Sequence, residues 1–185
     1  MQKGGSVLNY LNIKDFDIAN GPGIRVSLWV SGCDVHCPGC HNPESWDFNA
    51  GKPFTQKTID KIIEMLDSPV IRGLTVTGGH PLAFQNREWV YKLISQVRRQ
   101  LPDKDIWLYT GYVMQIGNFI ENAKIDLRDD IVQMCDVIVD GPYVEEERDI
   151  SLLWRGSRNQ RLIDVKKTME TQEFHYYGEI NLDLL

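Results

Sequence analysis

Three cysteines fall close together in the sequence, at Cys33, Cys37 and Cys40, with the spacing C-x3-C-x2-C. This spacing places three thiols on one short loop. An iron–sulfur cluster that serves electron transfer is usually held by four cysteine thiolates. Three cysteine ligands on a cluster of four irons would leave one iron without a protein thiolate, and such an open iron could bind a substrate. The spacing therefore indicates a 4Fe-4S cluster, one per chain, with three cysteine ligands.

The same loop permits other chemistry. Three thiolates together with the imidazole of His36 or His41 would make a closed structural zinc site. The string from Cys37 to His41 matches the C-x-x-C-H pattern of haem attachment, but that chemistry belongs to exported proteins, and the start of the chain lacks the apolar segment of a signal peptide. A thioredoxin-like pair at Cys37 and Cys40 would normally open a helix and have no third cysteine upstream. The iron–sulfur and zinc interpretations both stay open at this point.

The composition restricts the possible partners and surroundings. The 185 residues carry a net charge of −6, whereas binding to phosphate backbones needs clustered Lys and Arg, so we expect no nucleic-acid partner. No apolar run approaches the roughly 20 residues that a membrane span needs, so we expect no membrane partner. Three of the four cysteines are clustered, which is unlike a secreted disulfide framework. We therefore expect a cytoplasmic protein with one globular domain.

The apolar pattern predicts short strands that alternate with amphipathic helices, which is typical of an α/β fold with a parallel sheet. In such sheets the functional residues lie at the carboxyl ends of the strands. The cysteine loop, the pair Gly78-Gly79, the pair Thr110-Gly111 and the pair Gly141-Pro142 each follow a predicted strand, so we expect them at one edge. Cys135 begins the last of these strands and is expected to be a small buried hydrophobe. The predicted strands cover residues 7–13, 24–30, 74–77, 105–110 and 135–140, and the predicted helices cover residues 55–68, 86–101 and 114–122.

Several strings of residues resemble the radical S-adenosylmethionine superfamily, and within it the activating proteins of anaerobic ribonucleotide reductase. The cysteine spacing is that of the superfamily, whereas the string from Trp154 to Arg161 points to the activating proteins. The resemblance extends over about residues 7–165. The strings that carry it are the cysteine loop, Asn20-Gly21-Pro22-Gly23-Ile24-Arg25, Leu74-Thr75-Val76-Thr77-Gly78-Gly79, Tyr109-Thr110-Gly111-Tyr112, Asp136-Val137-Ile138-Val139-Asp140-Gly141-Pro142-Tyr143 and Trp154-Arg155-Gly156-Ser157-Arg158-Asn159-Gln160-Arg161.

The resemblance implies an open partial (β/α) barrel of the radical SAM type, with a parallel sheet and helices outside. Residues 1–185 would form a single domain, with a core at about residues 7–165 and a C-terminal tail at about residues 170–185. S-adenosylmethionine (SAM) would bind the open iron through its amino and carboxylate groups, and one electron from the cluster would break its sulfonium C–S bond. The resulting 5'-deoxyadenosyl radical would abstract hydrogen from a glycine Cα of anaerobic ribonucleoside-triphosphate reductase. A flavodoxin-like protein would donate the electron.

The resemblance also implies which residues contact SAM. Gly78 and Gly79 would let the backbone approach the methionine moiety closely, although the same pair could simply form a tight turn. Gly39, Cys40 and His41 would line the nucleoside side of the cofactor, although His41 could equally be a surface residue.

His80 departs from the family pattern, because an acidic residue usually follows the paired glycines and can accept hydrogen bonds from the cofactor ammonium. A neutral imidazole can still accept one bond through a ring nitrogen, whereas a protonated imidazole would repel an ammonium. Backbone carbonyls could then hold the amino group alone. We include His80 among the cofactor-binding residues, and we assign no catalytic residue beyond the cluster ligands.

Two regions and two other functions stay open. The cationic stretch from Trp154 to Arg161 suits a partner surface, but it could be a solvated loop. The segment from Glu170 to Leu185 could be a docking strand or a frayed tail. The chain could also activate a different glycyl-radical enzyme, or it could be a zinc-stabilised binding module without catalysis.

Overall fold

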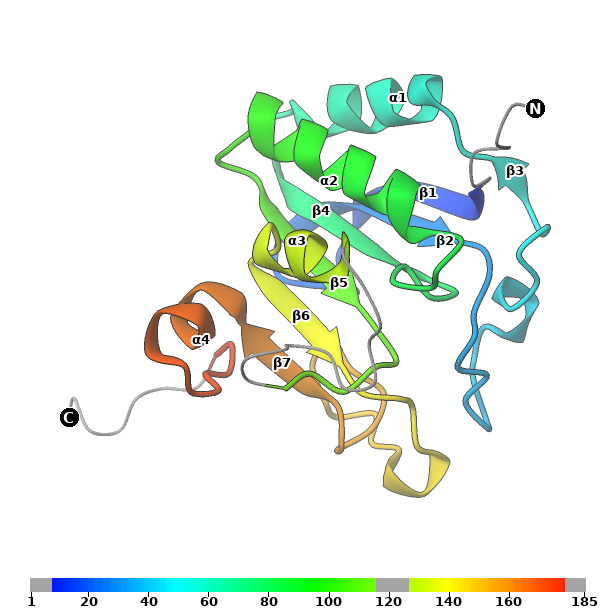
Figure 1. The fold of residues 1–185 in the computed structure, drawn as a ribbon, viewed down its shortest axis with the longest axis vertical. Coiled ribbons are helices and arrows are strands. Elements are labelled where there is room, and N and C mark those ends of the chain that lie inside the picture. Colours follow the sequence, from blue (N-terminus) through cyan, green and yellow to red (C-terminus); the bar gives the residue numbers. More distant parts are fainter. Residues whose placement is uncertain (1–7, 116–126, 179–185) are drawn as a thin grey trace.

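A seven-stranded sheet forms the centre of the fold, with the strand order β3-β1-β2-β4-β5-β6-β7 (Figure 1). The computed structural model describes residues 8–115 and 127–178. The strands are β1 (Asn9–Asp17), β2 (Ile24–Val30), β3 (Lys52–Pro53), β4 (Ile71–Gly78), β5 (Asp105–Tyr109), β6 (Val137–Asp140) and β7 (Arg161–Asp164).

The four central strands, β2, β4, β5 and β6, pair in parallel, as the sequence predicted. The prediction was wrong for the edges, where β1 pairs antiparallel with both β2 and β3, and β6 pairs antiparallel with β7. For β1 and β2 the reason lies in the connection, because a parallel pair needs a long crossover whereas residues 18–23 form only a tight turn between them. The fold is therefore a mixed α/β fold with a parallel centre.

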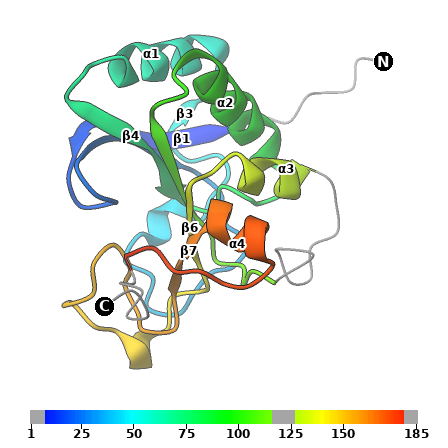
Figure 2. The same ribbon diagram turned by 90° about the vertical axis from the view of Figure 1, so that its left-hand side faces the viewer.

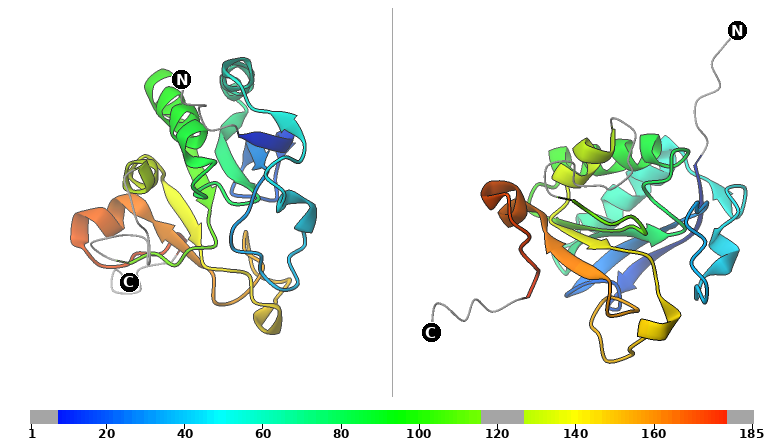
Figure 3. Two further views of the ribbon diagram at one scale, coloured as in Figure 1. Left: turned by 45° about the vertical axis from the view of Figure 1, so that its right-hand side comes forward. Right: turned by 60° about the horizontal axis from the view of Figure 1, so that its bottom comes forward.

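Helices α1 (Gln56–Leu66), α2 (Arg87–Gln100) and α3 (Leu127–Gln133) lie on one face of the sheet (Figure 1, Figure 3). Their apolar residues recur at helical spacing, so each helix can bury one stripe against the strands. Within the described ranges, no helix is both long and apolar enough to cross a membrane. The fully buried side chains of α1 and α2 are Ile59, Ile62, Leu66, Val90, Leu93, Ile94 and Val97.

The sequence predicted α1 and α2 but missed α3 and α4 (Val165–Thr171). Of the helix predicted at residues 114–122, Met114 and Gln115 are not helical, and the rest lies outside the described residues. Cys135 is 4% exposed, and burial raises the pKa of its thiol strongly, so the prediction of a small buried hydrophobe is confirmed.

The chain returns along β7 after α4 (Figure 2). Tyr176 forms a bridge with Ile163, and the Tyr177 amide donates to the Leu162 carbonyl at 2.7 Å. The Tyr177 ring packs edge-on against Trp107, with their centroids 5.0 Å apart. Up to Gly178, the segment that the sequence left open as a docking strand or a frayed tail is therefore attached to the sheet.

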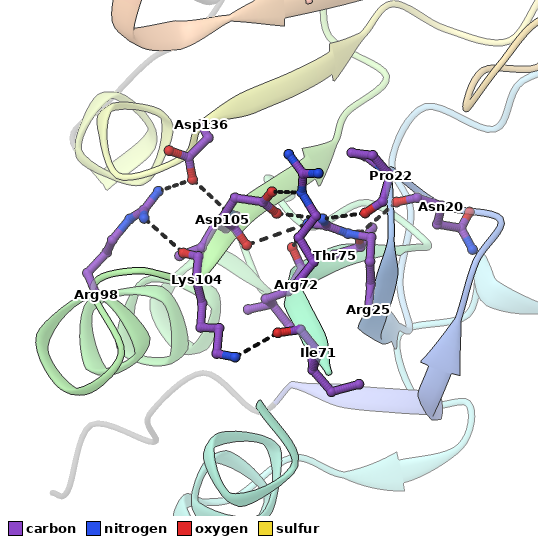
Figure 4. Close-up of polar contacts among 12 residues, drawn as sticks. Asn20, Pro22, Arg25, Ile71, Arg72, Thr75, Arg98, Lys104, Asp105 and Asp136 are labelled. Carbon is purple, nitrogen blue, oxygen red and sulfur yellow. Dashed lines mark hydrogen bonds and ion pairs between the residues drawn. The ribbon is translucent and has the colours of Figure 1, made fainter. Parts of the chain in front are cut away.

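A buried arginine joins three of the central strands (Figure 4). The Arg25 side chain on β2 is fully buried, and its Nη1 lies 2.5 Å from Asp105 Oδ1 on β5. Arg25 Nε donates to Thr75 Oγ1 on β4 at 2.7 Å, and Nη2 donates to the Leu74 carbonyl at 2.8 Å. Burial lowers the pKa of Arg25, and the Asp105 carboxylate opposes that shift. Asp105 is thus the counter-charge that makes burial of this guanidinium tolerable.

We expect Asp105→Asn to lower the free energy of unfolding by about 3 kcal/mol, because it leaves a buried guanidinium without its counter-charge. Urea denaturation of the apoprotein measures this loss. The control is Glu88→Gln, which removes the charge from a surface pair with Lys92 at 2.8 Å and should cost less than about 1 kcal/mol. Equal losses in the two variants would show that the buried pair has no special role.

Candidate metal and cofactor site

The cysteine loop and the glycine turn leave the sheet side by side. Val30, the last residue of β2, pairs with Gly78, the last residue of β4. Because the two strands are parallel, the segments that follow them emerge at the same edge. The Gly79 amide donates to the Val30 carbonyl at 2.8 Å, and the His80 amide donates to the Gly32 carbonyl at 2.7 Å. The expectation that these two motifs share one edge is confirmed.

Gly78 packs against the end of β2, and Gly79 packs against the cysteine loop. Gly78 has a φ of +104°, and a Cβ there would lie 2.6 Å from the Val30 amide nitrogen and carbonyl oxygen. A Cβ on Gly79 would lie 2.8 Å from the Ser45 carbonyl oxygen and closer still to the Gly32 carbonyl oxygen. A side chain at Gly78 would therefore displace the end of β2, and one at Gly79 would displace the cysteine loop.

Asn86, at the start of α2, connects the cysteine loop to the glycine turn through its side-chain amide. The side chain is fully buried, and its Nδ2 donates to the carbonyls of Ser31, Gly32 and His80 at 2.9, 3.1 and 2.9 Å. One amide group thus ties the cysteine loop to the glycine turn. Sequence reasoning missed this role, because an Asn before a helix normally indicates only a helix start.

The three cysteines present sulfur atoms that accept backbone hydrogen bonds. The Val35 amide donates to Cys33 Sγ and the Asn42 amide to Cys40 Sγ, each at 3.4 Å. Burial raises the pKa of the Cys33 and Cys37 thiols, and backbone amides act in the opposite direction. Amide donors of this kind stabilise thiolates and tune iron–sulfur clusters, so this donor set fits a cluster.

The structure places the two histidines of the loop differently. The His36 ring stacks on Trp46, with their centroids 4.7 Å apart, whereas His41 faces the cavity beside the cysteines. In residues 8–115 and 127–178, no three His, Cys, Asp or Glu side chains come close enough together to hold a single metal ion. Thiolates that each bind a different iron of a cluster need no such convergence on one point.

A cavity of about 120 Å³ lies between the cysteine loop and the strand ends. It brings together every predicted site residue except Gly39, which instead lies against the Glu145 carboxylate. The cavity is also lined by polar groups that were not predicted to bind the cluster or the cofactor. The predicted lining residues are Cys33, Cys37, Cys40, His41, Gly78, Gly79 and His80, and the further polar ones include Ser45, Thr77, Thr110, Tyr143 and Gln160.

The His80 ring is held by two neighbouring side chains. The ring is 1% exposed, its Nδ1 is hydrogen-bonded to the Asp34 carboxylate, and its Nε2 lies 2.8 Å from Thr110 Oγ1. Thr110 Oγ1 also accepts the Tyr112 amide at 3.1 Å. Both ring nitrogens are therefore engaged within the protein.

Asp34, from the cysteine loop, places a carboxylate next to His80, the residue that follows the paired glycines. The Tyr112 hydroxyl donates to its second oxygen at 2.8 Å. Burial alone would raise the pKa of the Asp34 carboxyl, but the interactions with His80 and Tyr112 outweigh it and lower the pKa to about 2. The ionised Asp34 thus ties the cysteine loop to the ends of β4 and β5. Sequence reasoning missed it, although an acidic residue between the first two cysteines was a visible signal.

Comparisons with known proteins agree with this geometry. Residues 19–163 match the family described as 4Fe-4S single cluster domain. The chain is 42% identical over 155 residues to the anaerobic ribonucleoside-triphosphate reductase-activating protein of Escherichia coli (strain K12), covering 83% of this chain and 96% of that protein. It is 43% identical to the protein of the same name from Enterobacteria phage T4, covering 84% and 93%. It is 40% identical to the one from Vibrio cholerae serotype O1, covering 83% and 96%.

These matches extend over the cysteine loop, the glycine turn and the strands that position them. Their length and identity exceed what a shared cysteine spacing alone would give. The chain belongs to the family of anaerobic ribonucleoside-triphosphate reductase-activating proteins and contains the 4Fe-4S single cluster domain.

Proposed function

We propose that this chain activates an anaerobic ribonucleoside-triphosphate reductase by cleaving SAM reductively at a 4Fe-4S cluster. The observation that carries the proposal is the single cavity lined by three cysteines of one loop and by the glycine turn of the neighbouring strand. The activating proteins that it resembles over more than four-fifths of its length support the choice of the reductase as the protein substrate.

In this proposal Cys33, Cys37 and Cys40 hold the cluster and leave one iron open. The cluster would supply one electron to break the sulfonium C–S bond of SAM, so that the 5'-deoxyadenosyl radical formed can take a hydrogen atom from a glycine Cα of the reductase. The sulfur atoms of Cys33 and Cys40 already accept backbone amides, which would hold the negative charge of the thiolates. The part of the cavity lined by the glycine turn would then be available for SAM.

We assign the SAM contacts to Gly39, Cys40, His41, Gly78, Gly79 and His80. Because both nitrogens of His80 are engaged by Asp34 and Thr110, backbone carbonyls of the glycine turn would accept from the cofactor ammonium, and His80 would shape the wall. His41 lines the cavity and would face the nucleoside. None of these groups needs to transfer a proton, since the cofactor carries the radical chemistry and the protein supplies placement.

The proposal extends to the architecture and surroundings of the chain. The parallel centre of the sheet is compatible with an open partial (β/α) barrel of the radical SAM type, formed by residues 1–185 as one domain. A flavodoxin-like protein would supply the electron. The cytoplasm is the suitable compartment, because it keeps thiols reduced, and all four cysteines are free. The net charge of −6 favours no nucleic-acid partner.

We expect Cys37→Ala to abolish formation of 5'-deoxyadenosine, because the cluster loses one of its three ligands. The assay reconstitutes the protein anaerobically with iron and sulfide, adds dithionite and SAM, and quantifies 5'-deoxyadenosine together with iron and sulfide per chain. Cys135→Ala is the matched control, because this cysteine is buried away from the cavity. It should retain the iron content and the activity of the wild type.

Two results would contradict the proposal. A wild-type protein that binds zinc, remains colourless and makes no 5'-deoxyadenosine would support a zinc-stabilised binding module instead. Equal iron content in the Cys37→Ala and Cys135→Ala variants would show that the cysteine loop does not hold the cluster.

We expect Asp34→Asn to raise the KM for SAM about tenfold while leaving the iron content unchanged. The amide removes a charge-assisted hydrogen bond that contributes about 1.5–3 kcal/mol to holding His80 and the cavity wall in place. The matched control is Asp47→Asn, an exposed residue of the same loop whose side chain bonds only to Asn49 within the described residues. An unchanged KM in the Asp34→Asn variant would show that this network does not position the cofactor.

A pair of further variants separates the charge of the carboxylate from its position. His80→Asp alone would place a second carboxylate beside Asp34, and like charges at this distance repel, so the KM for SAM should rise. Adding Asp34→Asn removes that repulsion and leaves one carboxylate at position 80. The KM of this double variant should return toward that of the wild type, whereas additive losses would argue against a shared role.

A further inference from the structure

Exposed apolar side chains gather at the edge of the sheet that carries the cavity. Among the described residues, Phe84, Val113, Ile150 and Leu153 follow the ends of β4, β5 and β6 and are 70%, 40%, 89% and 68% exposed. The other large exposed apolar side chains, Phe16, Ile18 and Val70, lie at the opposite edge, in the segments that precede β2 and β4. The two groups resemble each other in type and exposure, so they offer an internal comparison.

The loop between β6 and β7, residues 141–160, carries two of these apolar side chains, Ile150 and Leu153. It projects from the same side of the molecule as the cysteine loop (Figure 1, Figure 3). Ile150 lines a second cavity of about 250 Å³, which shares His41 and Tyr143 with the cysteine cavity. Ile150 therefore lines a cavity that adjoins the cysteine cavity at His41 and Tyr143.

Contacts with β5 and an ion pair within the loop hold residues 141–160 in shape. The Tyr109 hydroxyl donates to the Trp154 carbonyl at 2.7 Å, and the Trp154 ring packs edge-on against Trp107 at 5.3 Å. Arg158 pairs with Asp149 at 3.0 Å, which closes the tip of the loop. The backbone that carries Ile150 and Leu153 is thus already ordered, so the binding of a partner would cost little conformational entropy of this loop.

Arg155 has a guanidinium nitrogen without an acceptor in the described part of the chain. Its Nε is buried and has no hydrogen-bond partner among the described residues, whereas Arg158 and Arg161 each pair with an aspartate. Arg155 lines both the cavity beside Ile150 and a polar cavity of about 400 Å³ on the other side of the loop. A half-buried guanidinium of this kind favours a bidentate bond to a carboxylate.

We propose that Ile150, Leu153 and Arg155 form the docking surface for the protein substrate. This inference rests on the proposed function, because a glycine Cα within a folded protein reaches the cysteine cavity only if that protein covers its entrance. The partner would present an apolar pocket and a carboxylate beside the segment that carries its glycine. Arginine is enriched among the residues that dominate binding energy in such interfaces, and the apolar side chains beside it would add buried area.

The test uses the reconstituted holoprotein and the anaerobic reductase of the same organism. The variants are Ile150→Asp, Leu153→Asp and Arg155→Gln, and the matched controls at the opposite edge are Ile18→Asp, Val70→Asp and Arg99→Gln. Titration calorimetry gives the Kd for the reductase, and electron paramagnetic resonance gives the yield of glycyl radical against reductase concentration. Formation of 5'-deoxyadenosine without reductase measures the chemistry alone.

We expect each loop variant to weaken binding to the reductase about tenfold or more, since an anchor residue typically contributes at least 1.4 kcal/mol. The yield of glycyl radical should fall at limiting reductase, the formation of 5'-deoxyadenosine should be unchanged, and the three controls should behave as the wild type.

Three outcomes would overturn the inference. If the loop variants bind the reductase as tightly as their controls, these residues do not form the docking surface, and the proposed function is unaffected. A change from dimer to monomer in the Ile150→Asp variant, without weaker binding to the reductase, would assign the surface to a second copy of this chain. A wild type that cleaves SAM but leaves the reductase without a radical would contradict the proposed function itself.

Discussion

The contact between two backbone segments, at the ends of β2 and β4, is the constraint on which the site depends. Parallel pairing brings Val30 opposite Gly78, so the cysteine loop and the glycine turn begin as neighbours. The Gly79 and His80 amides then donate to carbonyls of the other segment. Since a side chain at Gly79 would collide with the Gly32 carbonyl, close approach is possible only for glycine. The strand register therefore fixes where the cysteines lie.

Buried polar groups secure this contact at both ends of the strands. Asn86 gathers three carbonyls beneath the cavity, and Arg25 joins β2 to β4 and β5 near the opposite edge. An unpaired polar group in either place would cost free energy, so each group accepts few alternative arrangements. Asp34 likewise fixes the cysteine loop, because its carboxylate is hydrogen-bonded to His80. The loop carries the chemistry, but rigid strands and buried hydrogen-bond donors define its position.

Local patterns predicted much of the fold, and non-local contacts account for what they missed. The β2 strand was predicted with its correct bounds, and α1 and α2 within one or two residues, because apolar periodicity directly reflects burial. Periodicity says nothing about strand direction, so the antiparallel edges were missed. The cysteines and the glycine turn were found from their spacing, whereas Asp34 and Asn86 act through partners 46 and 55 residues away in the chain. Such pairings depend on strand register, which no short window of sequence contains.

The antiparallel return of β7 also determines what can reach the site. A parallel strand would require a crossover that carries the chain back to the far edge of the sheet. Because β7 instead runs against β6, residues 141–160 stay at the edge that holds the cysteines. They form the side of the cavity opposite the glycine turn through Gly141, Tyr143 and Gln160, and they display Ile150 to solvent. The deviation from a purely parallel sheet thus gives the cavity a wall that a protein partner can contact.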